Sequence, residues 1–326
     1  LVGLPVVRFS DLGIESSLVG CLADQGITEP FEVQIEAIPS AMEGRDICCR
    51  APTGSGKTLA FGLPLISRTG SAKPKKPTAL ILTPTRELAE QIRNVLDPLA
   101  WDSGMKVLSV YGGTSYGKQL RGLEKGVEIL VACPGRLLDL LKRNALSLED
   151  VGIVVLDEAD RMADMGFMEP VCKIIDQCIS EPQMILFSAT LDHEVSKLVK
   201  SYQNDPVRIE VGPKEISMDS MEHLFWNVKP YKKTEIAVKS VRRAGRSIIF
   251  CRTRAGVDRL SDEMQLDSVP LSSLHGGLNQ KQRDRAMRKF SSGRSMVLVA
   301  TDVAARGIDV EGINCVIHYD LSLIHI

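Results

Sequence analysis

Short apolar runs alternate with longer amphipathic stretches along most of the chain. The runs are rich in Val and Ile, as is typical of buried strands. They predict strands at Asp46–Arg50, Ala79–Thr83, Lys106–Tyr111, Glu128–Ala132, Gly152–Leu156, Met184–Ser188, Val207–Val211, Ser247–Cys251, Met296–Ala300 and Cys315–Tyr319. The stretches between them predict helices, among them Glu87–Leu96, Arg136–Lys142 and Lys281–Phe290. Strands separated by helices favour parallel α/β sheets.

Two segments interrupt this alternation. Thr69–Pro77 (TGSAKPKKP) is rich in Gly, Ser, Pro and Lys and predicts an exposed loop. Gly212–Ser220 (GPKEISMDS) follows a predicted strand and has no apolar period. The chain has 326 residues, enough for about two domains. We therefore predict a first domain at residues 1–211, a linker at 212–220 and a second domain at 221–326, which is short for a second α/β sheet.

The overall charge does not indicate a polyanionic partner, because the net charge is −1. The distribution is uneven, since residues 221–326 contain 17 Lys and Arg against 11 Asp and Glu. A basic second half suits phosphate contacts, although an excess of this size is a weak argument by itself.

Cysteine usage and hydropathy favour an intracellular protein. The eight cysteines form no CxxC pair and no spacing typical of zinc sites, so we expect small core residues in a reducing cytosol. No apolar run approaches the ~18 residues of a membrane span. The start, LVGLPVVRFSDLG, lacks the features of a signal peptide. We expect a cytoplasmic protein without membrane contact.

The segment Ala51–Thr58 (APTGSGKT) predicts a phosphate-binding loop. It lies between a predicted strand and the apolar helix start LAFGLPLI, the context that such a loop needs. Its glycines permit a tight turn in which backbone N–H groups and the helix start face an anion. The standard pattern begins with Gly, where Ala51 stands here, and the alternative is a chance Gly/Ser turn. We assign ATP binding to Thr53, Gly54, Ser55, Gly56, Lys57 and Thr58.

Two carboxylates follow the apolar strand Gly152–Leu156. Acids at the carboxyl end of a parallel strand lie where α/β sheets bind ligands. Asp157 is expected to hold Mg²⁺ through water, together with the Thr58 hydroxyl, and Glu158 to orient the water that attacks the γ-phosphate. The alternative is an acidic helix N-cap. With a phosphate-binding loop upstream, we assign catalytic roles to Lys57, Asp157 and Glu158.

From Phe9 to Asp320 the chain resembles the DEAD-box RNA helicase family. The motifs that carry the resemblance appear in the family's order: APTGSGKT, PTRELA, CPGR, DEAD, SAT, HGG and ATDVAARGID. The resemblance implies two RecA-like parallel-sheet domains in tandem and local, ATP-driven unwinding of RNA. It implies ATP and Mg²⁺ as cofactors and RNA bound through phosphate and ribose with little sequence preference.

The segment GITEPFEVQ, residues 26–34, is similar to the family's adenine-binding segment. The resemblance implies that Gln34 pairs with the adenine edge and that Phe9 stacks on the base. Ile27 stands where Phe is usual, and Phe31 where Thr is usual. The alternative for Phe9 is a core aromatic.

The resemblance also assigns RNA contacts. They fall on Pro84, Thr85, Arg86, Gly112, Gly113, Pro134, Gly135, Arg136, Thr253, Gly276, Thr301 and Asp302. Judged by residue type alone, Arg86 is equally a solvated or ion-paired arginine, and the two adjacent glycines are an ordinary turn. Cys133 replaces the family's usual Thr, which removes one hydroxyl.

Three further assignments concern coupling and the second domain. Ser188 and Thr190, in the motif SAT, are expected to couple the ATP state to RNA binding by bonding near Asp160. A helix cap is the alternative, and both can hold at once. Gly307 and Asp309 are expected to face the nucleotide.

The family pattern continues after YDL with a His-Arg…Gly-Arg-x-x-Arg segment that the sequence to Ile326 does not contain. Arginines of that kind contribute ~10³–10⁵ in rate. We therefore expect an incomplete second domain and weak ATP hydrolysis by this chain. Three alternatives stay open: a DNA helicase, a non-catalytic RNA clamp and an unrelated phosphate-loop NTPase.

Overall fold

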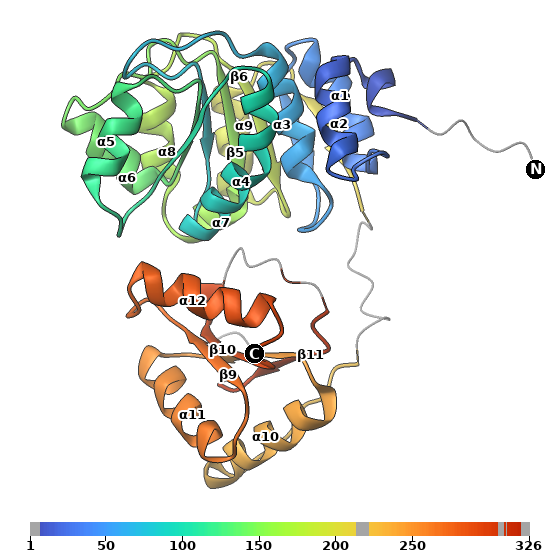
Figure 1. The fold of residues 1–326 in the computed structure, drawn as a ribbon, viewed down its shortest axis with the longest axis vertical. Coiled ribbons are helices and arrows are strands. Elements are labelled where there is room, and N and C mark those ends of the chain that lie inside the picture. The colour runs from blue at the N-terminus through green and yellow to red at the C-terminus, as the bar shows by residue number, and fades with distance from the viewer. Residues whose placement is uncertain (1–6, 213–221, 306–309, 311, 321–326) are drawn as a thin grey trace, which may run out of the picture. The chain divides into compact units, whose positions relative to one another are not determined.

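The structure is a computed structural model that describes residues 7–212, 222–305, 310 and 312–320. The chain divides into two compact units, Leu1–Glu215 and Ile216–Ile326. The division falls inside the predicted linker 212–220, most of which lies outside the described residues. Figure 1 shows the elements of each unit.

The first unit is built on one parallel sheet of seven strands. Its strand order is β3-β4-β2-β5-β6-β1-β7. The strands are β1 (Ile47–Arg50), β2 (Ala79–Leu82), β3 (Val107–Val110), β4 (Ile129–Ala132), β5 (Ile153–Asp157), β6 (Gln183–Ser188) and β7 (Val207–Glu210). The central strands β2, β4, β5 and β6 are buried along their whole length, which explains their continuous apolar runs.

Helices cover both faces of this sheet. They are η1 (Phe9–Leu12), α1 (Ser16–Asp24), α2 (Glu32–Met42), α3 (Lys57–Arg68), α4 (Arg86–Asp102), α5 (Tyr116–Glu124), α6 (Pro134–Lys142), α7 (Ala159–Asp164), α8 (Met168–Ile175) and α9 (His193–Tyr202). One core cluster joins α1 to α4 with one face, and a second joins α5 to α9 with the other. In Figure 1, α5, α6 and α8 lie on one side of the sheet and α1 to α3 on the other.

The second unit contains a smaller parallel sheet of four strands in the order β11-β8-β10-β9. The strands are β8 (Ser247–Cys251), β9 (Leu271–Leu274), β10 (Val297–Thr301) and β11 (Cys315–His318). The helices are η3 (Pro230–Lys232), α10 (Lys233–Ala244), α11 (Arg254–Leu266), α12 (Gln280–Ser291) and α13 (Asp302–Ala305). α10 and α11 pack on one face of the sheet, and α12 packs on the other.

The predicted strands are confirmed, each to within about one residue at either end. The strand β9 was missed because Ser272 and Ser273 interrupt its apolar run. Helix α4 begins at Arg86 and continues past the predicted end at Leu96 to Asp102, with Pro98 inside it. The fold class, parallel α/β in two sheets, is confirmed.

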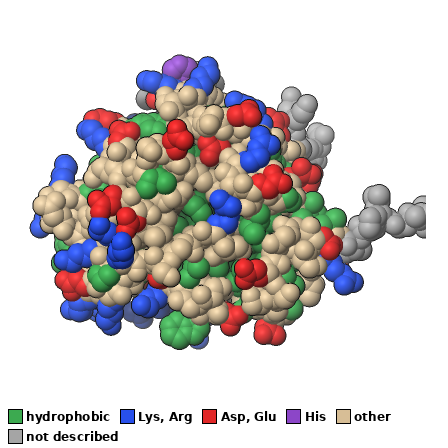
Figure 2. Space-filling model, turned by 90° about the horizontal axis from the view of Figure 1, so that it is seen from above, with side chains coloured by type: hydrophobic (Ala, Val, Ile, Leu, Met, Phe, Trp, Pro, Cys, Tyr) green, Lys and Arg blue, Asp and Glu red, His purple; other side chains and the backbone are tan. Residues whose placement is uncertain are grey.

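The surface of the first unit mixes charges of both signs. Figure 2 shows acidic and basic side chains interspersed over one face, with a group of Lys and Arg side chains at the lower left of the view. Within the ranges that the structure describes, no helix combines the length and apolarity needed to cross a membrane.

Candidate functional site

The first-unit residues singled out in the sequence lie at the carboxyl edge of its sheet, except for the N-terminal Phe9 and Gln34. The loops after β1, β5 and β6 occupy one half of that edge, and the loops after β2, β3 and β4 occupy the other. The loops that follow the strands come together at this edge. Open α/β sheets bind their ligands in the crevice outside the carboxyl ends of the strands. The order of strands therefore creates two neighbouring groups of candidate residues.

The loop between β1 and α3 is closed by its own hydrogen bonds. Ser55 Oγ donates to the Pro52 carbonyl at 2.9 Å, and Lys57 Nζ donates to the Ala51 carbonyl at 3.3 Å. Gly54 and Gly56 have φ of +79° and +87°, in the left-handed region that favours glycine. Lys57 is the first residue of α3 and is only 8% exposed, so its charge is held beside the helix start.

Gln34 packs against this loop from α2. Its Nε2 donates to the Gly56 carbonyl at 2.9 Å, and its Oε1 accepts from the Phe31 N–H at 2.9 Å. A primary amide has two hydrogens and two lone pairs. Gln34 therefore keeps one donor and one acceptor position beyond the two bonds that fix its orientation.

Two buried carboxylates stand at the end of β5. Asp157 is 3% exposed, and its Oδ1 has no hydrogen-bond partner among the residues that the structure describes. Burial raises the pKa of Asp157, while the positive charge of Lys57 acts in the opposite direction. Burial likewise raises the pKa of Glu158, against the opposing charges of Arg161 and Lys57. The charge of Lys57 thus acts on the carboxyl groups of both Asp157 and Glu158.

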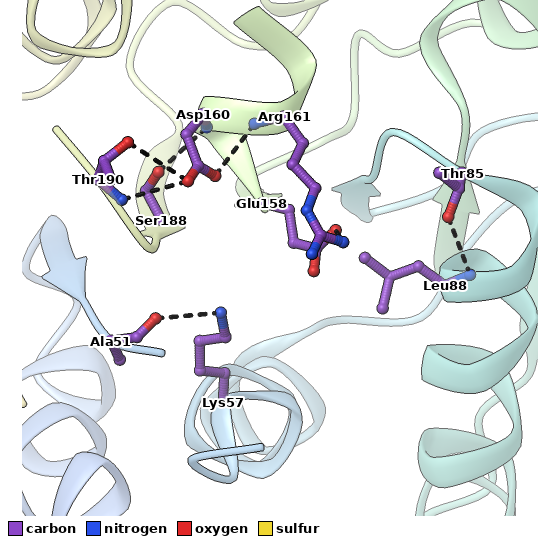
Figure 3. A network of polar contacts seen from close by, with 9 residues as sticks. All are labelled: Ala51, Lys57, Thr85, Leu88, Glu158, Asp160, Arg161, Ser188 and Thr190. Atoms are coloured by element: carbon purple, nitrogen blue, oxygen red, sulfur yellow. Dashed lines mark hydrogen bonds and ion pairs between the residues drawn. The ribbon is translucent and has the colours of Figure 1, made fainter. Parts of the chain in front are cut away.

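Glu158 is held in a strained backbone conformation. It has φ 56° and ψ 52°, a region that costs a residue other than glycine about 1–3 kcal/mol. Arg161, one turn further along α7, forms an ion pair with Glu158 Oε2 at 2.8 Å. Figure 3 shows Lys57 and Glu158 projecting into the space between the loop and β5. The fold therefore fixes the direction of this carboxylate.

Asp160 connects the end of β5 to the segment after β6. Its N–H donates to Ser188 Oγ at 3.0 Å, and its Oδ2 accepts from the Thr190 N–H at 3.2 Å and from Thr190 Oγ1 at 3.4 Å (Figure 3). The contact expected between SAT and Asp160 is present. The alternative was that a Ser or Thr of SAT caps the next helix. The cap of α9 is instead Asp192, whose side chain accepts from the Val195 N–H.

A magnesium ion would find oxygen donors in this half of the edge. The unpartnered Asp157 Oδ1 and the half-buried Thr58 hydroxyl are the hard ligands that Mg²⁺ prefers. Within the described residues, no three His, Cys, Asp or Glu side chains gather closely enough to hold a metal ion. These residues therefore fit an ion that takes most of its ligands from phosphate and water.

The other half of the edge is basic. The Arg86 guanidinium lies against Gly113, where a Cβ would come within 2.2 Å of Nη1. Gly113 also has φ +82°, so the backbone conformation there favours glycine. This contact joins the PTRELA segment after β2 to the Gly112–Gly113 turn after β3.

Arg136 is held by side chains of α5, the helix that follows β3. Its Nη1 donates to Gln119 Oε1 at 2.9 Å, and its guanidinium lies over the Tyr116 ring, 4.2 Å from the centroid. Gln119 is 5% exposed and also donates to the Tyr111 carbonyl at 3.1 Å. Burial and the nearby charges of Arg86 and Arg143 lower the pKa of Arg136. Clustered arginines of this kind favour an anion between them.

Several predicted RNA-contact residues also lie at helix starts. Thr85 Oγ1 accepts from the Leu88 N–H at 3.3 Å, and Thr253 Oγ1 accepts from the Gly256 N–H at 3.0 Å. A capping hydroxyl retains its hydrogen, so each can still donate to a phosphate oxygen. Pro134 is buried at the first position of α6.

Two further positions lie at the start of α6, Cys133 and Gly135. Gly135 faces open space. Cys133, at the N-cap of α6, makes no side-chain cap, and burial raises its thiol pKa to about 12.

In the second unit the candidates again lie at the carboxyl edge. Thr253 follows β8, Gly276 follows β9, Thr301 ends β10 and Asp302 begins α13. A Cβ on Gly276 would lie 3.1 Å from Arg254 Nη2, so a guanidinium borders this turn. Gly307 and Asp309 lie outside the described residues.

Phe9 lies in the protein core, which is the alternative considered for it. It is 1% exposed and belongs to the same apolar cluster as Leu12 and Leu18. Burial of this extent does not support the predicted stacking on adenine, which stays a prediction.

Sequence reasoning missed three residues that the structure places in the site. Arg161 could have been recognised, because the spacing i, i+3 on a helix brings it to Glu158. Gln119 gave no signal, because its contact with Arg136 depends on β3 lying beside β4. Phe31 was noted as a departure from the family, and it lies against Gly56 with 59% of its surface exposed.

Comparisons with known proteins match both units. The DEAD/DEAH box helicase model matches residues 31–198, and the helicase conserved C-terminal domain model matches residues 231–324. DEAD-box ATP-dependent RNA helicase 30 of Arabidopsis thaliana is 38% identical over 97% of this chain and 55% of its own length. The helicase CshA of Streptococcus pneumoniae is 38% identical over 97% of this chain and 60% of its own length. The chain thus spans a little more than half the length of these relatives.

Solved structures give the same result. S. cerevisiae Dbp5 bound to RNA and ADP BeF3 aligns with a TM-score of 0.84 at 28% identity, covering 97% of this chain and 82% of that one. A DEAD box protein from the hyperthermophile Methanococcus jannaschii aligns with a TM-score of 0.60 at 32% identity, covering 97% and 86%. The matches to both units, the order of the motifs and the geometry at the sheet edge agree with one another. The chain belongs to the DEAD-box helicase family.

Proposed function

We propose that the protein is an ATP-dependent RNA helicase that opens short RNA duplexes locally. One observation carries the proposal: a single sheet edge holds the Lys57, Asp157 and Glu158 group in one half and the Arg86 and Arg136 group in the other. The first group suits a triphosphate, and the second suits a sugar–phosphate backbone.

ATP binds by its phosphates at the start of α3. Backbone N–H groups around Gly54 and Gly56 donate to phosphate oxygens, and the helix dipole adds attraction for negative charge. Lys57 exchanges the Ala51 carbonyl, now at 3.3 Å, for β- and γ-phosphate oxygens. Gln34 meets the adenine edge with its remaining donor and acceptor.

Hydrolysis depends on the direction of Glu158. Its carboxylate accepts a hydrogen bond from the water that attacks the γ-phosphorus and takes up the proton that this water loses, while ADP leaves with the electrons of the broken P–O bond. Arg161, at 2.8 Å, keeps the Glu158 side chain in place. When bound with ATP at Asp157 and Thr58, Mg²⁺ would neutralise phosphate charge. Lys57 stabilises the charge that develops on the transferred group.

RNA binds across the basic half of the edge. Arg86 and Arg136 contact phosphates, Thr85 donates its free hydroxyl hydrogen, and Gly112 and Gly113 allow the backbone of the strand to approach closely. Contacts of this kind give little sequence preference, and the 2′-hydroxyl distinguishes RNA from DNA. Single-stranded RNA should therefore stimulate ATP hydrolysis far more than single-stranded DNA of the same sequence, and equal stimulation would favour a DNA helicase.

The Asp160 contacts couple the two ligands. Asp160→Ala removes the acceptor of both Thr190 bonds. We expect ATP affinity within a few-fold of wild type but RNA stimulation of hydrolysis reduced about tenfold or more, since a coupling energy of this kind is typically about 1–3 kcal/mol. Steady-state hydrolysis with and without RNA measures the ratio. An unchanged ratio would remove Asp160 from the coupling role.

Gln119 is proposed to position Arg136 for RNA. Because the two act as one unit, Gln119→Ala and Arg136→Ala should each weaken RNA affinity about tenfold, and the double variant should be no weaker than the poorer single variant. Fluorescence anisotropy with a labelled single-stranded RNA measures all four affinities, and ATP affinity serves as the control. Additive losses would show that Gln119 acts independently of Arg136.

We also propose that the protein acts in the cytoplasm. All eight cysteines are free thiols, and burial raises the pKa of Cys49, Cys178 and Cys251 to about 12. Free thiols suit a reducing compartment. Imaging of a fluorescently tagged protein tests the assignment, and exclusive accumulation in an oxidising compartment would contradict it.

A further inference from the structure

Phe31 is an exposed aromatic side chain beside the phosphate-binding loop. It is 59% exposed, whereas Phe9, Phe61 and Phe187 are buried in the core of the same unit. It occupies the N-cap position of α2, three residues before Gln34. Exposure of a large apolar ring at a polar site calls for an explanation, because it leaves apolar surface in water.

The ring shares its position with the Gln34 amide. A Cβ built on Gly56 would lie 2.5 Å from Phe31 Cδ2 and 2.6 Å from Gln34 Nε2. The ring and the amide therefore lie on the same side of Gly56, at the start of α3. The Phe31 N–H also donates to Gln34 Oε1 at 2.9 Å, so the two residues are linked directly.

This pairing matches the chemistry of a nucleobase. A base offers a flat π face and an edge of hydrogen-bond donors and acceptors. Phe31 presents a flat apolar face with more than half of its surface free. Gln34 is 2% exposed beneath it, and its amide has one hydrogen and one lone pair that its two hydrogen bonds do not use. Phe9, at 1% exposure, has no such free face.

We propose that Phe31 supplies the aromatic face on which the base of the bound nucleotide stacks, while Gln34 hydrogen-bonds to the edge of that base. The inference rests on the proposed ATP site and adds the residue that holds the base there. Stacking depends on the π face and not on the edge pattern, so Phe31 contributes affinity for any purine, and Gln34 provides the choice between adenine and guanine.

The test compares ATP, GTP and inorganic tripolyphosphate, each with Mg²⁺, by competition against a fluorescent nucleotide. Phe31→Ala should weaken ATP and GTP alike by about tenfold, the magnitude expected for one base stacked on an aromatic ring. It should leave the affinity for tripolyphosphate unchanged, because that probe has no base. Phe31→Tyr should retain ATP affinity, and Phe31→Leu should lose it to nearly the same extent as Phe31→Ala. Gln34→Ala should instead change the ratio of ATP to GTP affinity.

The outcomes separate this inference from the proposed function. If Phe31→Ala binds ATP as wild type does, while Lys57→Ala has lost both ATP and tripolyphosphate, the stacking role is wrong and the ATP site stands. If Phe31→Ala loses tripolyphosphate as well, the ring supports the loop and does not hold a base, which also overturns the inference. If Lys57→Ala affects neither probe, the ATP site itself is misplaced. Thermal unfolding of each variant checks the fold, and the Tyr and Leu variants decide the question should Phe31→Ala be unstable.

Discussion

Lys57→Ala is expected to lower ATP affinity by at least about a hundredfold. Hydrogen bonds to charged groups contribute about 1.5–3 kcal/mol each, and Lys57 reaches two phosphate groups. The side chain is 8% exposed and already lies at the loop, so its charge is placed before the nucleotide arrives. Titration of a fluorescent ATP analogue in the presence of Mg²⁺ measures the loss.

A surface lysine provides the matched control for this experiment. Lys173 lies on α8, where its side chain is 61% exposed and pairs with Glu169. Lys173→Ala removes the same charge from the protein at a distant element and should bind ATP as wild type does. Equal ATP affinity of wild type and Lys57→Ala would show that the triphosphate binds elsewhere.

Glu158→Gln is expected to leave ATP binding intact and to reduce turnover about 10²–10⁴-fold, the range for loss of a general base. Gln keeps the shape of Glu and can still accept from Arg161, so the loop after β5 should keep its conformation. Single-turnover hydrolysis and equilibrium binding separate the two effects. Glu169→Gln, at a residue whose side chain is 78% exposed, is the control. Hydrolysis by Glu158→Gln at the wild-type rate would exclude Glu158 from the chemistry.

The pH dependence of hydrolysis follows from the same residue. Burial raises the pKa of Glu158 above its ordinary value of 4.5, and only the ionised carboxylate can take up a proton from the attacking water. Turnover should therefore be constant at higher pH and fall as the pH drops through a value above 4.5. The Glu158→Gln variant should lack this acidic limb.

The strands could be predicted because most of them carry their own signal. Central strands of a parallel sheet are buried on both faces, so their residues are apolar throughout. β9 is the exception, because its serines are satisfied by tertiary contacts: Ser272 Oγ lies 2.7 Å from Ser295 Oγ, and Ser273 donates to Ser261 at 2.8 Å. Partners so far along the chain cannot be read from a local pattern.

The candidate site likewise has a part that local sequence predicts and a part that depends on long-range contacts. Lys57, Asp157 and Glu158 could be predicted because Asp157 and Glu158 stand where one strand ends and Lys57 ends the loop after another, and parallel strand ends meet at one edge. The orientation of each side chain could not. Arg136 depends on Gln119 from the neighbouring helix α5, and the core position of Phe9 depends on how η1 packs against α1 and α2. Residue types and their order along the chain identify the site. The contacts that orient each side chain form only when the strands and helices have assembled.

ATP and RNA are expected to bind to one molecule and to favour the same state of it. Reciprocity then requires each ligand to strengthen the binding of the other. The most direct measurement is the affinity for a short single-stranded RNA with and without Mg²⁺ and a non-hydrolysable ATP analogue. We predict affinity at least about tenfold tighter with the analogue, and no such difference in Lys57→Ala. Identical RNA affinities of the wild-type protein in both conditions would contradict the account.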